Sequence, residues 1–484
     1  MVCSSAKPRP KACLSAQLDG ISDRVAKALG KDKPRKGPRL ISKEAAKVLP
    51  DKDALEAEFQ RSRTLRILAI VALIIVIAWF LLALFEPGLK YEFSASTAYP
   101  IDSKEFLSEL EALSDARVAW HSTVQPLPNG EVFYPAEIEA INGARRSVDI
   151  EGYIFKRGDV ARQFVNALTD RARAGVRVNV VIDAIGSLTT PKHFFRDLID
   201  AGGHVEWYHP LRWNNIFRSN NRTHRELIVV DGKTAFVGGA GIADHWLITK
   251  KNAPRWRDNM YRIQGDSVSA LQGTFVENWV EASGEIIAGP DYFPLSIGQG
   301  STPALVVNSS PGAGGSTRAR MLFQSLVVAS KKTIYITTPY FLPDRAMKRE
   351  LLKARKRGVD VRILVPGAKS DHAMTRSSSR SKFGDLLLAG AHIYEYQPAM
   401  IHAKLLIVDG AWVVVGSTNF DTRSFGINDE VNLAAMDPAL AQRMTEMYTE
   451  DLAQSHEVTY DEWKRRPPWE RVQEVFGWLL ERQQ

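Results

Sequence analysis

The pattern of apolar and polar residues predicts strands that alternate with helices over most of the chain. Short apolar runs rich in β-branched residues predict strands at 147–155, 176–183, 204–208, 333–341, 359–365 and 392–396. Apolar residues at helical spacing predict helices at 102–113, 137–144, 160–174, 194–199, 321–330 and 345–356. This alternation predicts an α/β fold with mixed sheets.

The second part of this pattern repeats the first. The stretch 201–210 (AGGHVEWYHP) is echoed by 389–398 (AGAHIYEYQP), and 223–244 is echoed by 401–421. A segment rich in Gly, Pro and Ser separates the two copies and predicts a linker. We therefore expect two repeated α/β sandwich halves packed about a pseudo-twofold axis. The expected boundaries are 117–288 for the first half, 289–303 for the linker and 304–484 for the second half.

Both copies of the repeat contain a strand, a two-residue turn and a second strand. Asp231-Gly232 and Asp409-Gly410 are hairpin dipeptides, so Asp231 and Asp409 are interpreted as turn residues. In the second copy, side chains alternate along the first strand, so we expect His402 and Lys404 to share one face.

The second copy of the repeat also gathers groups that suit a phosphate ester. Ser417 and Asn419 follow its second strand, so an imidazole, an ammonium, a hydroxyl and a carboxamide can converge. A strand end with a solvated lysine explains one such stretch equally well. The equivalent His224 in the first copy changes this balance, because two packed copies would bring His224 and His402 face to face at their interface.

Composition restricts the partners and the cofactors that we expect. The net charge of the 484 residues is +8, but the excess of Lys and Arg lies within 1–66 and the rest of the chain is close to neutral. No domain-wide electrostatic footprint for nucleic acid is visible, although a local basic groove stays open. Cys3 and Cys13 are the two cysteines, so no cysteine-based metal site is predicted in the body. The zinc-binding pattern H-E-x-x-H is also absent from the sequence.

The N-terminal part of the chain predicts a membrane anchor. Residues 1–66 read as a basic, mostly disordered tail, and 67–85 (ILAIVALIIVIAWFLLALF) is apolar without a charge. As a helix this stretch would be roughly 28 Å long, about the thickness of a bilayer core. Arg61, Arg63 and Arg66 precede it, so the positive-inside rule places the N-terminus in the cytoplasm and the body across the membrane. Residues 86–116 are a connecting segment.

The motifs carry a resemblance to a known family. His402, Lys404 and Asp409 form H-x-K-x4-D, Gly416, Ser417 and Asn419 form the trailing G-S-x-N, and the first copy holds a variant of this motif at His224. A doubled motif of this kind resembles the phospholipase D superfamily. Within that superfamily the chain is similar to bacterial cardiolipin synthases, on the stretches 151–155 (EGYIF), 370–372 (SDH), 394–398 (YEYQP) and 429–433 (DEVNL).

The resemblance implies a membrane-anchored phosphatidyltransferase. Such an enzyme transfers a phosphatidyl group between two phosphatidylglycerol molecules and releases glycerol. One phosphodiester is exchanged for another, so no nucleotide, metal or other cofactor is expected. The expected partners are phospholipids and the membrane rather than nucleic acid, and the expected location is the cell (inner) membrane with the catalytic domain on its outer side.

The resemblance also implies roles for single residues. One histidine attacks the phosphodiester and forms a phosphohistidine, while the other protonates the leaving alcohol and later deprotonates the acceptor. We assign His224 as the nucleophile and His402 as the acid/base, with the exchanged assignment left open. Buried acceptors are expected to hold the far ring nitrogens. Asp258 is the candidate for His224 and Glu430 is the candidate for His402. Lys404, Ser417 and Asn419 are expected to bind phosphate oxygens.

The first motif departs from the pattern of the family at two positions. Glu226 stands where the family has lysine, and Gly241 stands where the lipid branch usually has asparagine. A carboxylate at ~4 Å from a phosphate is repelled by about 4 kcal/mol at an effective dielectric constant of 20. Glu226 must therefore be protonated, turned away, or neutralised by Arg222, Arg225 or a bound cation.

These departures leave several functions open. In one, the enzyme is active and Lys404 makes most of the contacts to the phosphate oxygens. In another, Glu226 recognises a substrate with an additional cationic or hydroxyl group. In a third, the protein binds lipid without turnover. A phospholipase D that hydrolyses phospholipids and a nuclease of the same superfamily are further alternatives, since both would use the same histidines.

Overall fold

The structure of the protein is a computed structural model that describes residues 52–85, 91–93, 99–210, 220–249, 254–295, 298–311, 317–467 and 470. The prediction of a disordered tail falls, for residues 1–51, outside the described residues. The chain divides into two compact units, residues 1–85 and residues 86–484.

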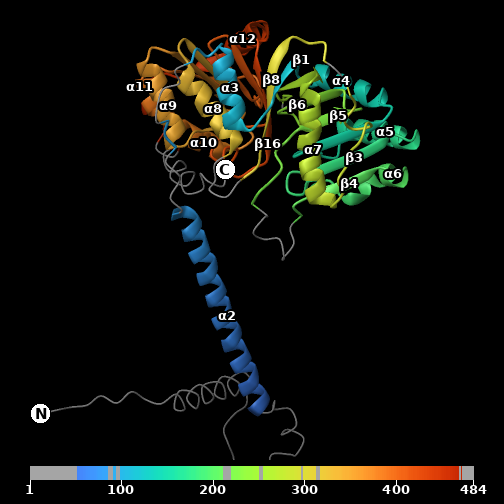
Figure 1. Cartoon of the computed structure of the whole chain (residues 1–484). Helices are drawn as coiled ribbons and strands as arrows, with labels where there is room; N and C mark the ends of the chain where they lie inside the picture. Colours follow the sequence, from blue (N-terminus) through green and yellow to red (C-terminus); the bar gives the residue numbers. More distant parts are fainter. Residues whose placement is uncertain are drawn as a thin grey trace, which may run out of the picture. The chain divides into compact units, whose positions relative to one another are not determined.

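The described part of the first unit is a single long helix, α2 (Lys52–Phe85), drawn in blue in Figure 1. It contains the apolar stretch 67–85, and the apolar side chains described between Ile67 and Trp79 are exposed. Among the residues that the structure describes, no helix has both the length and the apolarity that crossing a membrane requires.

The second unit contains the predicted alternation of helices and strands. Its helices are α3 (Lys104–Ser114), α4 (Gly130–Asn142), α5 (Asp159–Arg173), α6 (Arg196–Asp200), α7 (Ser267–Ser283), α8 (Arg318–Ala329), α9 (Arg345–Lys356), α10 (Ala373–Ser381), α11 (Phe383–Leu388), α12 (Pro438–Leu452) and α13 (Tyr460–Lys464). Its strands are β1 (Val118–Pro128), β2 (Ser147–Gly152), β3 (Arg177–Asp183), β4 (His204–Tyr208), β5 (Leu227–Val230), β6 (Thr234–Gly238), β7 (Asn259–Gly265), β8 (Thr302–Ser309), β9 (Thr333–Thr337), β10 (Phe341–Leu342), β11 (Asp360–Pro366), β12 (His392–Tyr396), β13 (Leu405–Val408), β14 (Trp412–Gly416), β15 (Phe420–Asp421), β16 (Glu430–Met436) and β17 (Ser455–Glu457).

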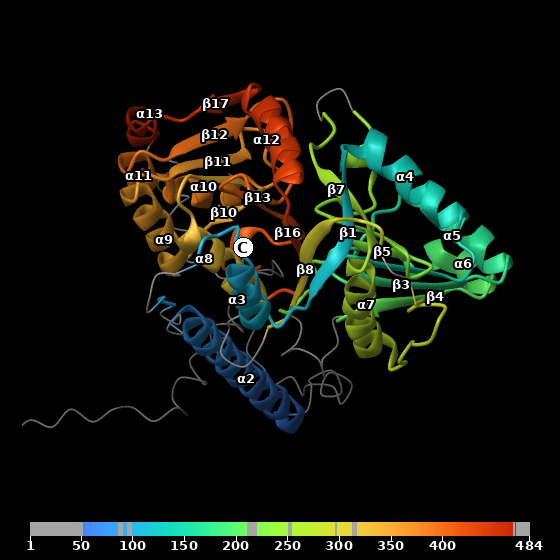
Figure 2. The same ribbon diagram turned by 45° about the horizontal axis from the view of Figure 1, so that its top comes forward.

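One mixed sheet joins most of these strands. Its order is β17-β12-β11-β9-β13-β14-β16-β8-β1-β7-β6-β5-β2-β3-β4. Apart from β17, the two halves of the sheet have equivalent strand orders. From the edge to the centre they run β12-β11-β9-β13-β14-β16-β8 and β4-β3-β2-β5-β6-β7-β1. At the centre, β8 pairs antiparallel with β1. These two strands lie side by side in Figure 2. The repeat in the sequence therefore corresponds to two halves of one continuous sheet, with parallel strands near both edges.

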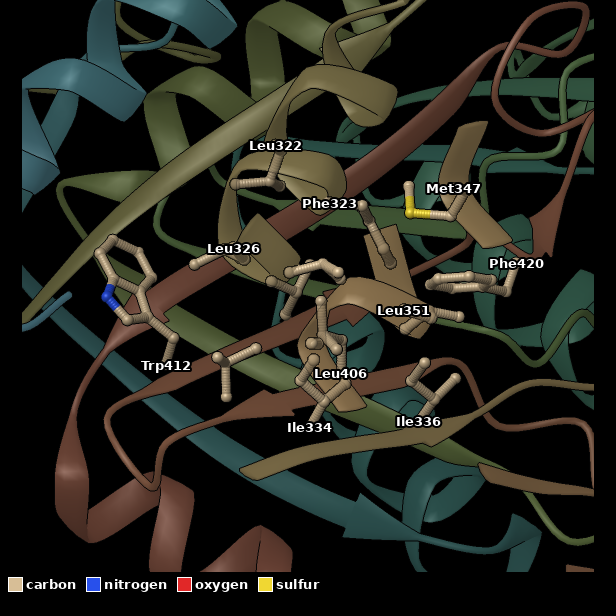
Figure 3. Packing of buried hydrophobic residues seen from close by; sticks show 14 of the residues in the cluster. Leu322, Phe323, Leu326, Ile334, Ile336, Met347, Leu351, Leu406, Trp412 and Phe420 are labelled. Carbon is tan, nitrogen blue, oxygen red and sulfur yellow. The ribbon is translucent and has the colours of Figure 1, made fainter. Parts of the chain in front are cut away.

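Buried apolar side chains form three clusters around this sheet. In the second half, α3, α8, α9 and α11 pack on the strands. Figure 3 shows Leu322 of α8 and Met347 of α9 in this cluster. In the first half, α4, α5 and α6 pack on the equivalent strands. The third cluster includes Phe275 of α7 and Met444 of α12 together with strand residues of both halves, so the two halves share a core.

The central strands and several helices were not predicted from the sequence. Among them are strands β1, β7, β8 and β16 and helices α7, α10, α12 and α13. Strand β8 begins within the stretch expected as a linker. We expected each half to form its own sandwich, but the pairing of β1 with β8 merges the halves into one sheet. Strand pairing between residues so far apart in sequence leaves little local pattern.

Candidate active site

The interpretation of Asp231 and Asp409 as turn residues is confirmed. Both have φ of 54° and are followed by a glycine that also has positive φ, which is the conformation of a type I′ hairpin turn. The carboxylate of Asp231 accepts hydrogen bonds from the backbone N–H groups of residues 145–147, and that of Asp409 from those of residues 331–333. Each aspartate therefore ties its hairpin to the start of the neighbouring strand.

The two histidines lie where the halves of the sheet meet. The backbone N–H of His224 donates to the carbonyl oxygen of Asp429 in the second half at 2.9 Å. The backbone N–H of His402 donates to the carbonyl oxygen of Arg257 in the first half at 2.7 Å. Each histidine is thus fixed by the backbone of the opposite half, and both imidazoles belong to one interface.

The predicted pairing of each histidine with a carboxylate is wrong, and the actual pairs are crossed. The Nδ1 atom of His224 lies 3.0 Å from both carboxylate oxygens of Glu430. The Nδ1 atom of His402 lies 2.9 Å from Oδ2 of Asp258. The prediction paired each histidine with a carboxylate of its own half, whereas the structure supplies the carboxylate from the other half.

Both carboxylates are fully buried, and their surroundings keep them ionised. Burial raises the pKa of Asp258, but the hydrogen bond with His402, the charge of Lys404 and the backbone N–H of Asn259 lower it, and the net pKa is below the ordinary value. Burial also raises the pKa of Glu430, and His224 outweighs it in the same way. An ionised acceptor at Nδ1 fixes the tautomer of each ring, so that Nε2 is the atom available for chemistry.

Lys404 lies against His402, as the shared face predicted. Its Nζ is 2.9 Å from Nδ1 and 3.2 Å from Nε2 of His402, and it donates to the carbonyl oxygen of Gly239 at 3.3 Å. A Cβ at Gly239 would come within 2.9 Å of Cδ of Lys404, so the absence of a side chain there lets the lysine cross from the second half to the first. Burial lowers the pKa of Lys404.

Ser417 and Asn419 differ in how they face the site. The hydroxyl of Ser417 donates to the carboxylate of Glu430 and accepts the backbone N–H of Val431, so in this structure it positions Glu430. The side chain of Asn419 is buried, and its Oδ1 has no protein partner. A direct role of Ser417 and Asn419 in binding phosphate stays a prediction.

The two departures from the motif, Glu226 and Gly241, are in contact. A Cβ at Gly241 would lie 2.9 Å from Oε1 of Glu226 and 2.5 Å from the carbonyl oxygen of Ile154. Oε1 of Glu226 accepts the backbone N–H of Ile154 at 3.1 Å, and burial raises the pKa of Glu226 well above its ordinary value. Ile154 and the carboxyl group of Glu226 together leave no room for a side chain at 241. This carboxyl group is bonded to the backbone and favours its neutral form.

The two arginines that could neutralise Glu226, Arg222 and Arg225, interact with other groups instead. Arg222 lies 3.4 Å from Asp183 and donates to backbone carbonyl oxygens, and Arg225 is paired with Glu277 and Glu151. The carboxyl group of Glu226 is turned toward the backbone of Ile154, burial favours its protonated form, and neither arginine forms an ion pair with it in the described residues.

Aromatic rings pack around the two histidines, and the sequence analysis did not identify them as site residues. The ring of Tyr153 is 5.3 Å from that of His224. The rings of Trp256 and Trp246 are 5.3 and 5.6 Å from that of His402, and Trp246 Nε1 also donates to Asp258 at 3.0 Å. Tyr153 stands in the stretch 151–155, and Trp256 lies two residues before Asp258, but nothing in the sequence indicates that their rings face the histidines. Within the described ranges, no group of three or more His, Cys, Asp or Glu residues is arranged to hold a metal ion.

The fold and the site define a class of protein. The structure is similar to that of a phosphatidylserine synthase from Haemophilus influenzae, with a TM-score of 0.59 and 15% sequence identity over 78% of this chain and 99% of that chain. At this identity the likeness concerns the fold alone. Residues 138–268 and 324–452, which hold both histidines and both carboxylates, match the family model described as cardiolipin synthase, phospholipase D-like domain.

Curated relatives specify the family further. The chain is 34% identical to the major cardiolipin synthase ClsA of Bacillus subtilis over 80% of this chain and 81% of the relative. It is 34% identical to a cardiolipin synthase of Listeria welshimeri over 73% of each chain. The protein therefore belongs to the cardiolipin synthase family of phospholipase D-like proteins.

Proposed function

We propose that the protein is a phosphatidyltransferase that makes cardiolipin from two molecules of phosphatidylglycerol and releases glycerol. The observation that carries this proposal is the crossed arrangement, in which two imidazoles at one interface are each held through Nδ1 by a buried carboxylate of the opposite half. The relatives that are named cardiolipin synthases support the choice of lipid.

The chemistry needs two transfers at one phosphorus atom. In the first, the Nε2 lone pair of one imidazole forms a bond to phosphorus, and the bond from phosphorus to the glycerol oxygen breaks. The other imidazole gives its proton to that oxygen, so that neutral glycerol leaves. In the second, the hydroxyl of another phosphatidylglycerol attacks phosphorus while the same imidazole takes its proton, and the phosphorus–nitrogen bond breaks.

Fixed polar groups would stabilise the charge that develops on the phosphoryl oxygens. Lys404 is buried beside His402, and Asn419 is a buried carboxamide with N–H donors. Preorganised donors in a site that excludes water contribute more than the same groups in solvent. Because one phosphodiester replaces another, the reaction needs no nucleotide.

A membrane location follows from the same proposal. We infer that 67–85 anchors the protein in the cell (inner) membrane, with Arg61, Arg63 and Arg66 on the cytoplasmic side and the catalytic unit on the outer side. Two lines of support are the apolar composition of this stretch and the exposure of its described side chains on α2. Phosphatidylglycerol is itself a membrane lipid, so an anchored enzyme meets its substrate in two dimensions.

The proposal is tested with the purified full chain in vesicles of phosphatidylglycerol. Lipid mass spectrometry should detect cardiolipin, with glycerol released in equal amount, and His224→Ala and His402→Ala should abolish both products. His392→Ala is the matched control, because His392 is an exposed histidine that is also bonded to a carboxylate, Glu457. Phosphatidic acid as the main product would indicate hydrolysis instead. Cleavage of single-stranded DNA without lipid turnover would indicate a nuclease, and lipid binding without any product would indicate an inactive relative.

A further inference from the structure

We propose that the two histidines have fixed and different roles, with His402 as the nucleophile and His224 as the acid/base, which reverses the assignment expected from the sequence. This inference rests on the proposed phosphatidyl transfer through a phosphohistidine. The inference follows from Glu226, which stands where the first motif would carry a lysine. His402 therefore has the ammonium of Lys404 against its ring, whereas His224 has no equivalent lysine.

The surroundings of His402 favour a neutral ring. If Asp258 accepts the proton of Nδ1, Nε2 carries a lone pair. The Lys404 ammonium lies against the same ring, 2.9 Å from Nδ1 and 3.2 Å from Nε2. The other ionisable group that acts on the ring is Asp371, and the aromatic rings of Trp246, Trp256 and Tyr340 close the remaining sides. An imidazolium would place a second positive charge against the Lys404 ammonium, so the contact favours the neutral ring.

The pKa of His402 is also shifted in the direction that favours the neutral ring. Burial, and after it the charge of Lys404, lower the pKa of His402 despite the opposing hydrogen bond from Asp258. A group that resists protonation is a poor general acid and a competent nucleophile, because only the neutral imidazole has an electron pair to give to phosphorus.

The surroundings of His224 are the opposite. Both oxygens of Glu430 lie 3.0 Å from Nδ1, the carboxyl group of Asp421 is a second acidic neighbour, and Tyr153 packs against the ring. No lysine or arginine among the described residues is hydrogen-bonded to this ring. The motif position that would carry the lysine holds Glu226, which is bonded to the backbone of Ile154. An imidazolium at His224 therefore faces carboxyl groups and meets no ammonium.

These surroundings assign the steps. The Nε2 lone pair of His402 attacks phosphorus, and Nε2–H of His224 gives its proton to the departing glycerol oxygen. In the second step His224 takes the proton of the acceptor hydroxyl, and the bond between phosphorus and His402 breaks as the new ester forms. The proton and the electron pair return to their starting atoms, so no further reactant is needed.

A substrate with an activated leaving group separates the two roles. In the p-nitrophenyl ester of phosphatidic acid, the leaving group departs at neutral pH without a proton, so the first step requires the nucleophile and not the acid. His224→Asn should release about one equivalent of p-nitrophenol per chain as a burst, and the phosphatidyl label should map to His402 by mass spectrometry of peptides. His402→Asn should give neither burst nor label.

The outcomes decide the inference separately from the proposed function. A burst from His402→Asn with the label on His224 would overturn the assignment, and so would labelling of both histidines or of neither. Thermal unfolding identifies a variant that fails to fold, and His224→Gln and His402→Gln then replace the asparagine variants. Failure of the wild-type chain to make cardiolipin from phosphatidylglycerol would contradict the proposed function, whereas the labelled residue would still report which ring attacks phosphorus.

Discussion

The crossed pair of Asp258 and His402 makes a quantitative prediction. Asp258 is fully buried and accepts hydrogen bonds from His402 Nδ1 at 2.9 Å, from Trp246 Nε1 at 3.0 Å and from the backbone N–H of Asn259 at 2.8 Å. In Asp258→Asn, the shape is kept and the charge is lost. The amide can no longer serve as an ionised acceptor for His402, so the ring is free to adopt the tautomer whose Nε2 carries the proton.

The expected loss follows from the energy of a hydrogen bond to a charged group. Such a bond contributes about 1.5–3 kcal/mol, which corresponds to a fall in kcat of roughly 10- to 150-fold at 1.4 kcal/mol for each factor of ten. The KM for phosphatidylglycerol should change by less than about threefold, because Asp258 positions His402 and does not touch the lipid. The assay is the initial rate of cardiolipin formation in vesicles.

A matched control and a thermal measurement complete this experiment. Asp266→Asn removes a carboxylate that is bonded to a histidine, His121, at the surface of the same half at 2.9 Å, and it should keep the wild-type rate. Asp258→Asn should also be measured for its Tm, so that slow turnover is not mistaken for unfolding. A variant that stays folded and within threefold of the wild-type kcat would refute the role given to Asp258.

Further predictions concern the altered motif, the turns and the response to pH. Glu226→Gln should retain turnover within about threefold, because burial already favours the neutral carboxyl group, and a loss above 30-fold in the vesicle assay would show that its charge is needed. Gly241→Asn should lower stability by about 1–3 kcal/mol in chemical denaturation, because its Cβ would meet atoms at 2.5 to 2.9 Å. Gly273→Ala, where a Cβ meets nothing within 4 Å, should not lower it. Asp409→Ala should destabilise the fold by about 1–3 kcal/mol through three unpaired backbone N–H groups and leave the KM unchanged; an unaltered Tm would contradict this. Because the pKa of His402 is lowered, the neutral ring persists as pH falls to about 6.5, and kcat/KM should decline only below that value; a decline already between pH 8 and 7 would argue against a neutral nucleophile at His402.

Local features of the site were predictable from the sequence. The hairpin turns at Asp231 and Asp409 follow from dipeptides that favour positive φ at both positions, and the structure has them. The contact between His402 and Lys404 follows from their spacing of two residues. Helix α9 and strand β12 have the predicted bounds, because their apolar pattern is strong and local.

Features that depend on how the halves meet were not predictable. The carboxylates of Asp258 and Glu430 were identified as partners of the histidines, but each was assigned to the wrong ring. Sequence distance favours a partner in the same half, whereas the bridges between Thr223 and Asp429 and between Arg257 and Ile401 bring the opposite half closer. The sequence also does not predict the orientation of Glu226. Only the structure shows that its carboxyl group lies next to Gly241 and accepts a hydrogen bond from Ile154.

A structure with a bound phosphoryl mimic tests most directly whether both imidazoles act on one phosphorus atom. In a crystal of the protein grown with orthovanadate, we expect vanadium bonded to Nε2 of His402, one of its oxygens within hydrogen-bond distance of Nε2 of His224, and another near Lys404. Vanadate bound to only one ring, with the second histidine turned into a different pocket, would contradict the account.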